Sequence, residues 1–125
     1  MHNISKANTK IEMLNKNLNS YLSSIQILKT TIKQTTATIF ELKREIWEIV
    51  GKLIRNNGKN YEWRKSYIDY INETTIEIHQ LILQQNNIQS IMKSYYQTIY
   101  AIQIRKLYIQ NYIDDLKSNL EFYEI

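Results

Sequence analysis

The sequence predicts an all-α protein, a long antiparallel coiled-coil helical hairpin, and three observations support this prediction. Proline is absent and only two glycines occur in 125 residues, although the turns of sheet-rich folds usually recruit both residue types. Apolar residues recur with heptad spacing on both sides of the midpoint. The midpoint, RNNGKN at residues 55–60, has no apolar residue. We therefore expect helices over about 3–56 and 61–123, with a turn at 56–60, in a single all-helical domain of residues 1–125.

The first expected helix carries two apolar heptad rows, which form its half of the predicted seam. With Ile4 as position a, Thr35 is the one polar residue in seven heptads. The a positions are Ile4, Ile11, Leu18, Ile25, Ile32, Ile39, Ile46 and Leu53. The d positions are Ala7, Leu14, Tyr21, Leu28, Thr35, Leu42 and Ile49.

The same spacing resumes after the turn and supplies the other half of the seam. One row is Tyr67, Thr74, Leu81, Ile88, Tyr95, Ile102, Ile109, Leu116 and Tyr123. The other row is Ile71, Ile78, Gln85, Met92, Ile99, Lys106, Ile113 and Leu120. A 3.5-residue repeat on both sides of a single turn indicates two helices wrapped around each other. At about 1.5 Å per residue, each helix would be on the order of 80–90 Å long.

The sequence around the turn supplies the expected helix ends. Gly58, or a neighbouring asparagine, is expected to adopt the left-handed conformation that closes a helix C-terminus. Lys52 and Arg55 lie in the last turn of the first helix, where positive charge suits the helix dipole. Asn60 is expected to cap the second helix, with Glu62 in its first turn. A loop this short makes the two helices antiparallel.

Two polar seam residues leave two registers and a second architecture open. One register places Thr35 opposite Gln85, and the other places Gln85 against Leu28. We favour the first, because polar residues that meet each other avoid hydrocarbon and fix the register. Residues 30–38 are rich in β-branched side chains and residues 84–87 are polar, so both are poor helix formers. Bends at these sites would give the alternative fold, kinked arms forming a three- or four-helix bundle.

Apolar residues outside the seam form a candidate protein interface. A two-helix coil would leave them in water, and contiguous apolar patches usually mark an interface, where tyrosine and tryptophan are favoured. The alternative is that the chain folds on itself and buries them. The candidate interface residues are Phe40, Trp47, Ile54, Tyr96, Tyr100, Ile104, Leu107, Tyr108 and Tyr112.

Positive charge gathers around the turn. Residues 52–65 carry five positive side chains and one negative side chain, which equals the whole net charge of +4. Such a cluster attracts phosphates, anionic headgroups and acidic protein surfaces, although no nucleic-acid-binding signature accompanies it. The alternative is solvated charge around an exposed turn. The candidate polyanion-binding tip is Lys52, Arg55, Lys59, Tyr61, Trp63, Arg64 and Lys65.

Nothing in the sequence predicts catalysis, a cofactor or a metal site. His2 is terminal, and His79 has no second histidine in a metal-binding motif. Asp114 and Asp115 are adjacent on a helix, so they do not face each other as a paired acid and base would. Cysteine is absent, which removes thiolate ligands, disulfides and a cysteine nucleophile. We therefore expect no catalytic, cofactor-binding or metal-binding residue, and no enzymatic activity.

The composition also bears on location. No apolar run approaches the roughly 18 residues of a membrane span, and residues 1–20 are too polar for a signal peptide. We expect no transmembrane segment, no secretion by a signal peptide, and a location in the cytoplasm or within a virus particle or host cell. Ile, Asn, Lys and Tyr make up 57 of the 125 residues. Their codons are A/T-rich, which indicates an A/T-rich genome, as in some phages and large viruses.

The predicted function is that of a non-enzymatic coiled-coil structural or assembly subunit of a larger protein complex. A phage or virus particle is one setting that the composition suggests. The partner would be a second copy, in a homo-oligomer, or a different protein chain, in a hetero-complex. The alternative is a small binding module, which binds nucleic acid through its basic aromatic tip or acts as a helical adaptor or inhibitor of a host protein.

Overall fold

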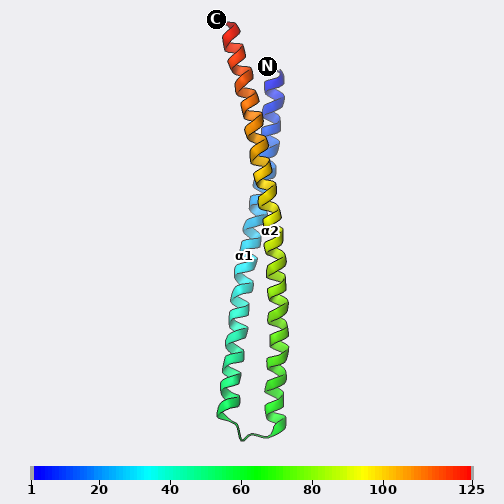
Figure 1. Cartoon of the computed structure of the whole chain (residues 1–125), viewed down its shortest axis with the longest axis vertical. Helices are drawn as coiled ribbons and strands as arrows, with labels where there is room; N and C mark the ends of the chain where they lie inside the picture. Colours follow the sequence, from blue (N-terminus) through cyan, green and yellow to red (C-terminus); the bar gives the residue numbers. More distant parts are fainter. Residues whose placement is uncertain (1, 125) are drawn as a thin grey trace. The chain divides into compact units, whose positions relative to one another are not determined.

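The chain forms two long helices joined by one short turn (Figure 1). The computed structural model describes the backbone of residues 2–124 and the side chains of residues 2–120. Helix α1 spans His2–Arg55 and helix α2 spans Tyr61–Glu124. The two helices contact each other as a hairpin, and the described residues contain no strand. The predicted fold class is confirmed, with the turn at the expected position.

Neither helix is interrupted where the alternative bundle would need bends. Residues 30–38 lie inside α1, and residues 84–87 lie inside α2. The hydroxyl of Thr35 donates to the carbonyl of Thr31 at 2.8 Å, and Thr38 makes the same kind of bond at 3.1 Å. These threonines satisfy their hydroxyls within the helix, so their presence does not break it. The three- or four-helix bundle of shorter helices is therefore wrong.

The hairpin consists of two units. The turn unit comprises Leu28–Ser90 and contains the turn. The terminal unit combines the α1 residues before Leu28 with the α2 residues after Ser90. In the terminal unit, the rings of the seam residues Tyr21 and Tyr95 meet edge to face, with centroids 5.3 Å apart. Each unit therefore contains an α1 segment packed against an α2 segment along a length of the seam.

The predicted seam is the core of both units. All of the buried side chains belong to the heptad rows, and they are Ala7, Ile25, Ile39, Leu53, Thr74, Ile78, Ile99, Ile102 and Ile113. The other described seam residues are half-buried, except Leu120, which is exposed. Tyr123 lies outside the described side chains. Among residues 2–120, no buried side-chain nitrogen or oxygen lacks a hydrogen-bond partner.

The register of the turn unit follows from one polar contact across the seam. The side-chain amide of Gln85 donates to the Thr36 hydroxyl at 2.7 Å and lies 3.5 Å from the Ile32 carbonyl oxygen. Gln85 therefore faces the part of α1 that the favoured register predicts, and it does not face Leu28. Its partner is Thr36 instead of Thr35, whose hydroxyl donates to the Thr31 carbonyl of its own helix.

Candidate functional site

Side chains close the end of α1, and a left-handed glycine does not. No described residue has a positive φ, so the expectation that Gly58 or an asparagine adopts the left-handed conformation is wrong. The backbone N–H and the side-chain amide of Asn56 both donate to the Lys52 carbonyl, at 3.0 and 2.9 Å. The N–H of Lys59 then donates to the Asn56 carbonyl at 3.1 Å. Lys52 and Arg55 occupy the last turn of α1, as predicted.

The Arg64 guanidinium completes this closure from the other helix. Its Nη1 donates to the Leu53 carbonyl at 3.0 Å and lies 3.4 Å from the Asn56 carbonyl oxygen. Carbonyls at the end of a helix lack helical partners and carry the negative end of the helix dipole. A charged donor is therefore well matched to them. Arg64 links the start of α2 to the end of α1, so its charge is already engaged within the chain.

The start of α2 is capped as the sequence predicts. The N–H of Trp63 donates to the Asn60 side-chain oxygen at 2.9 Å, and Glu62 lies in the first turn. The Trp63 ring meets the ring of Tyr67 edge to face, with centroids 4.8 Å apart. The Lys52 ammonium lies 5.9 Å from the Tyr67 centroid, a cation–π distance. Trp63 and Lys52 therefore pack on a seam residue beside the turn.

The rest of the predicted polyanion-binding tip is exposed. It consists of Arg55, Lys59, Tyr61 and Lys65, and the Tyr61 side chain is 75% exposed. The Arg55 guanidinium lies along its own helix over Gly51. If Gly51 carried a Cβ atom, that atom would lie 3.3 Å from Arg55 Nη1. Of the seven predicted tip residues, Trp63 and Arg64 are therefore half-buried, and the other five are exposed, including Lys52 with its ammonium over the Tyr67 ring.

The predicted interface residues of α1 form an exposed row in the turn unit. Phe40, Trp47 and Ile54 are seven residues apart and are 67%, 75% and 72% exposed. Each directly follows a seam residue, so the row borders the seam along α1. Lys43 and Val50 lie between its members, and Val50 is half-buried. We call Phe40, Trp47 and Ile54 the exposed row.

The predicted interface residues of α2 all lie in the terminal unit, and all of them are exposed. They are Tyr96, Tyr100, Ile104, Leu107, Tyr108 and Tyr112, and we call them the tyrosine patch. Tyr108 and Tyr112 reach the edge of α1, where they line a shallow groove with Lys6 and Lys10. The groove gives these two tyrosines cationic neighbours on the other helix, which heptad spacing did not reveal.

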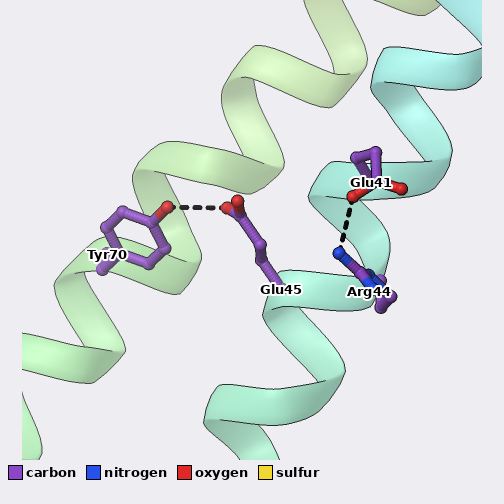
Figure 2. Close-up of polar contacts among 4 residues, drawn as sticks. All are labelled: Glu41, Arg44, Glu45 and Tyr70. Atoms are coloured by element: carbon purple, nitrogen blue, oxygen red, sulfur yellow. Dashed lines mark hydrogen bonds and ion pairs between the residues drawn. The ribbon is translucent and has the colours of Figure 1, made fainter.

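One polar contact between the helices was not predicted. The Tyr70 hydroxyl donates to the Glu45 carboxylate at 2.8 Å (Figure 2). This bond raises the pKa of the Tyr70 hydroxyl above its ordinary value of 10.0, because it holds the protonated phenol beside a negative charge. On α1, the Arg44 guanidinium pairs with the Glu41 carboxylate at 2.7 Å. Glu45 and Tyr70 each directly precede a seam residue, which is the only sequence signal for their contact.

The described residues were compared with metal sites, membrane spans and known proteins. Among residues 2–120, no group of three or more His, Cys, Asp or Glu side chains is placed to hold a metal ion. Over the same residues, neither helix is long and apolar enough to cross a membrane. No protein-family model matches the chain, and comparisons with curated proteins and with solved structures give no match. The geometry itself therefore has to indicate the function, and it presents an apolar row, a tyrosine patch and a cationic turn.

Proposed function

We propose that this protein is a non-enzymatic assembly subunit whose helical hairpin binds other helices in a larger complex. The observation that supports the proposal is the exposed row of Phe40, Trp47 and Ile54 beside a seam that is already filled. The seam holds α1 to α2, so the exposed row is not needed for that contact. A phage or virus particle is the setting that the high content of Ile, Asn, Lys and Tyr suggests.

The spacing of the exposed row favours a helix as its partner. Side chains seven residues apart lie on one face of a helix, which is the arrangement of a coiled-coil contact. Burying each of these large apolar side chains contributes roughly 1.5–3 kcal/mol. The summed free energy of burying the three side chains is comparable to the lower part of the roughly 4–15 kcal/mol that association costs. The tyrosine patch supplies a second apolar contact of the kind that dominates interface energies.

Light scattering on the purified protein tests this function. The wild type is expected to form a stable oligomer, or to co-purify in a fixed ratio with one partner chain from its source cells. Tyr100→Lys with Ile104→Lys, and separately Phe40→Lys with Trp47→Lys, should each weaken the assembly while helix content by circular dichroism stays unchanged. Gln97→Lys with Gln103→Lys is the matched control, because both glutamines are exposed on α2.

Three results would contradict the proposal. The first is a wild type that stays monomeric at all concentrations and recovers no partner in a fixed ratio. The second is a loss of helix content in the Tyr100 and Ile104 variant, which would place the tyrosine patch in an internal core. The third is assembly that survives every lysine variant, which would show that these apolar surfaces do not hold the complex together.

A second candidate function is polyanion binding at the turn. Lys59, Lys65 and Tyr61 are exposed at adjacent positions of the turn and the start of α2, so cations and an aromatic ring are available together. Phosphates would pair with the lysines, and Tyr61 would stack on a base of single-stranded nucleic acid. Arg64 contributes less, because its guanidinium is bonded to carbonyls of α1.

Salt-dependent binding to single-stranded and double-stranded nucleic acid and to anionic vesicles tests this second function. Lys59→Ala with Lys65→Ala should reduce the magnitude of the logarithmic salt slope by roughly 0.7–0.9 for each phosphate contact removed. Lys10→Ala with Lys16→Ala, on α1 in the terminal unit, is the control. If the tip variant and the wild type bind alike, or if neither binds at low salt, the tip is a solvated turn.

A further inference from the structure

The exposed row of α1 is symmetric about its own centre. Trp47 lies seven residues from both Phe40 and Ile54, so the row has the same spacing in either chain direction. If a second α1 lay antiparallel across the first and centred on Trp47, the two Trp47 rings would meet. Each Phe40 would then lie opposite the Ile54 of the other copy. A surface that complements itself in this way fits a twofold interface.

The charges along the row are also complementary to themselves in this alignment. Helical spacing places Arg44 at the edge of the row that faces away from the seam, with Glu41, Glu48 and Arg55 one step further around the same side of the helix. With Trp47 opposite Trp47, Arg44 lies within two residues of the copy's Glu48, and Glu41 lies within two residues of the copy's Arg55. Symmetry makes each attraction occur twice. The two Glu48 carboxylates also approach each other near the axis, with an Arg44 on either side of them.

We propose that the exposed row binds the same row of a second copy of this chain, with the two α1 helices antiparallel about Trp47. The inference rests on the proposed function, and it names the partner as a second copy. A parallel twofold arrangement would turn the charged edge of one copy toward the seam-side edge of the other, so these attractions would be lost. The Arg44–Glu41 ion pair within α1 is more than half exposed, so its rearrangement on binding costs little.

The one lysine within the row also fits the antiparallel alignment. Lys43 lies four residues before Trp47 and Gly51 lies four residues after it, so Lys43 lies level with the copy's Gly51 and next to the copy's Val50, which is on the same edge of the row. In this alignment the aliphatic part of Lys43 packs on the copy's Val50 while its ammonium reaches water. The Arg55 guanidinium, which lies over Gly51 in the single chain, would move to the copy's Glu41.

The size of the row predicts a reversible dimer. Buried aromatic side chains cover roughly 150–250 Å² each, and Phe40 and Trp47 are 67% and 75% exposed. These two side chains therefore supply about a third of the roughly 800 Å² that each partner buries in a typical specific interface. Ile54, Val50 and the charged edge add to this area. We expect the dimer to dissociate on dilution.

Cross-linking of single-cysteine variants tests the alignment, since the chain has no cysteine of its own. Lys43→Cys and Gly51→Cys are prepared separately, kept reduced, and treated with a short bis-maleimide either alone or as an equal mixture. The antiparallel alignment predicts a cross-linked dimer in the mixture and little in either variant alone. A parallel alignment predicts the reverse and would overturn the proposal. Circular dichroism of both variants confirms that each is folded.

Charge exchange tests the same interface without cysteine. Glu48→Arg should raise the dissociation constant of the dimer about threefold or more, because each Arg44 then faces an arginine. Arg44→Glu combined with Glu48→Arg should restore the wild-type value. Analytical ultracentrifugation over a range of concentrations measures both constants. Failure of the double variant to restore association would overturn the charge pairing.

The outcomes separate this proposal from the proposed function. Assembly without the predicted cross-link, or assembly that survives Phe40→Lys with Trp47→Lys, overturns self-pairing through the exposed row and leaves an assembly subunit. A monomeric chain that binds a different protein in a fixed ratio through the row also overturns self-pairing and leaves the proposed assembly function standing. A chain that is monomeric and without a partner under all conditions overturns both. A concentration-dependent dimer with the mixed cross-link supports both.

Discussion

Two rows of apolar side chains run along α1 one residue apart, and their surroundings are opposite. The seam residues Ile39 and Leu53 are 8% and 9% exposed, whereas their neighbours Phe40 and Ile54 are 67% and 72% exposed. Helix α2 covers the first row, and no described residue covers the second. Heptad spacing therefore identifies a face that suits a helix, but it does not tell which chain provides that helix.

The difference assigns different energetic roles to the two rows. A seam side chain loses its water when α1 meets α2, so its burial contributes to folding. A side chain of the exposed row keeps its water in the single hairpin and loses it only on association. Substitutions in the two rows should therefore separate folding from assembly, and neighbouring residues provide matched controls.

The largest expected effect is in the seam. Ile39→Ala should lower the free energy of unfolding by about 2–4 kcal/mol, because it leaves a cavity where a buried side chain was. Phe40→Ala, at the next residue, should change it by no more than about 0.5 kcal/mol. Urea denaturation followed by circular dichroism, at concentrations where the protein is monomeric, measures both. Thr35→Ala should also have little effect, because the Thr35 hydroxyl bonds within its own helix.

Two other outcomes of this experiment would contradict the distinction between the buried seam and the exposed row. Equal losses at Ile39 and Phe40 would show that the chain buries the exposed row within itself. Negligible losses at Ile39 and at Ile32, which lies in the same row, would mean that the seam has been assigned to the wrong positions.

The fold could be predicted from the sequence because one pattern determines most of it. A seven-residue repeat with one break specifies two helices, a turn and an antiparallel seam, and the buried residues all lie at the predicted positions. Propensity was the weaker guide, because the β-branched residues 30–38 suggested a bend that the structure does not have. Threonine hydroxyls bond to carbonyls one turn earlier and stay helical, so seam packing overrides the local preference.

The candidate sites were less predictable, because they depend on contacts distant in sequence. All nine proposed interface residues are exposed, as a two-helix coil requires. The charged tip could not be divided in advance, since composition does not show that the Arg64 guanidinium is bonded to the Leu53 carbonyl. The glycine in the turn suggested a left-handed cap, and the structure closes α1 with Asn56 and Arg64 instead.

An intermediate effect is expected at the end of the seam. Arg64→Met removes the donor to the Leu53 and Asn56 carbonyls and should lower the free energy of unfolding by about 1 kcal/mol. Lys65→Met, at the next and exposed position, should change it by no more than about 0.5 kcal/mol. Gly58→Ala should be neutral or slightly stabilising, because its φ is not positive and no atom lies within 4 Å of an added Cβ.

The opposite result at the turn would support a left-handed Gly58 as the C-terminal cap of α1. If Gly58→Ala lowers the free energy of unfolding by about 1 kcal/mol and Arg64→Met changes nothing, a left-handed glycine closes α1. The tip cations would then all be free for a polyanion. Thermal denaturation of the two variants and of Lys65→Met, at one ionic strength, decides between the two closures.

The smallest expected effect concerns the polar edge of the seam, where the Tyr70 hydroxyl donates to Glu45. Since this bond raises the pKa of Tyr70 above 10.0 in the folded chain, its contribution to stability is fully present below pH 10.0. It is lost as the pH rises through the raised pKa, because the tyrosinate has no proton to donate and is repelled by the carboxylate.

Tyr70→Phe should therefore be slightly less stable than the wild type at neutral pH, and the difference should shrink in alkaline solution. Tyr61→Phe, at a more exposed tyrosine in the first turn of α2, is the control for the loss of a tyrosine hydroxyl. A difference for Tyr70→Phe that stays constant with pH would show that the contact contributes packing alone.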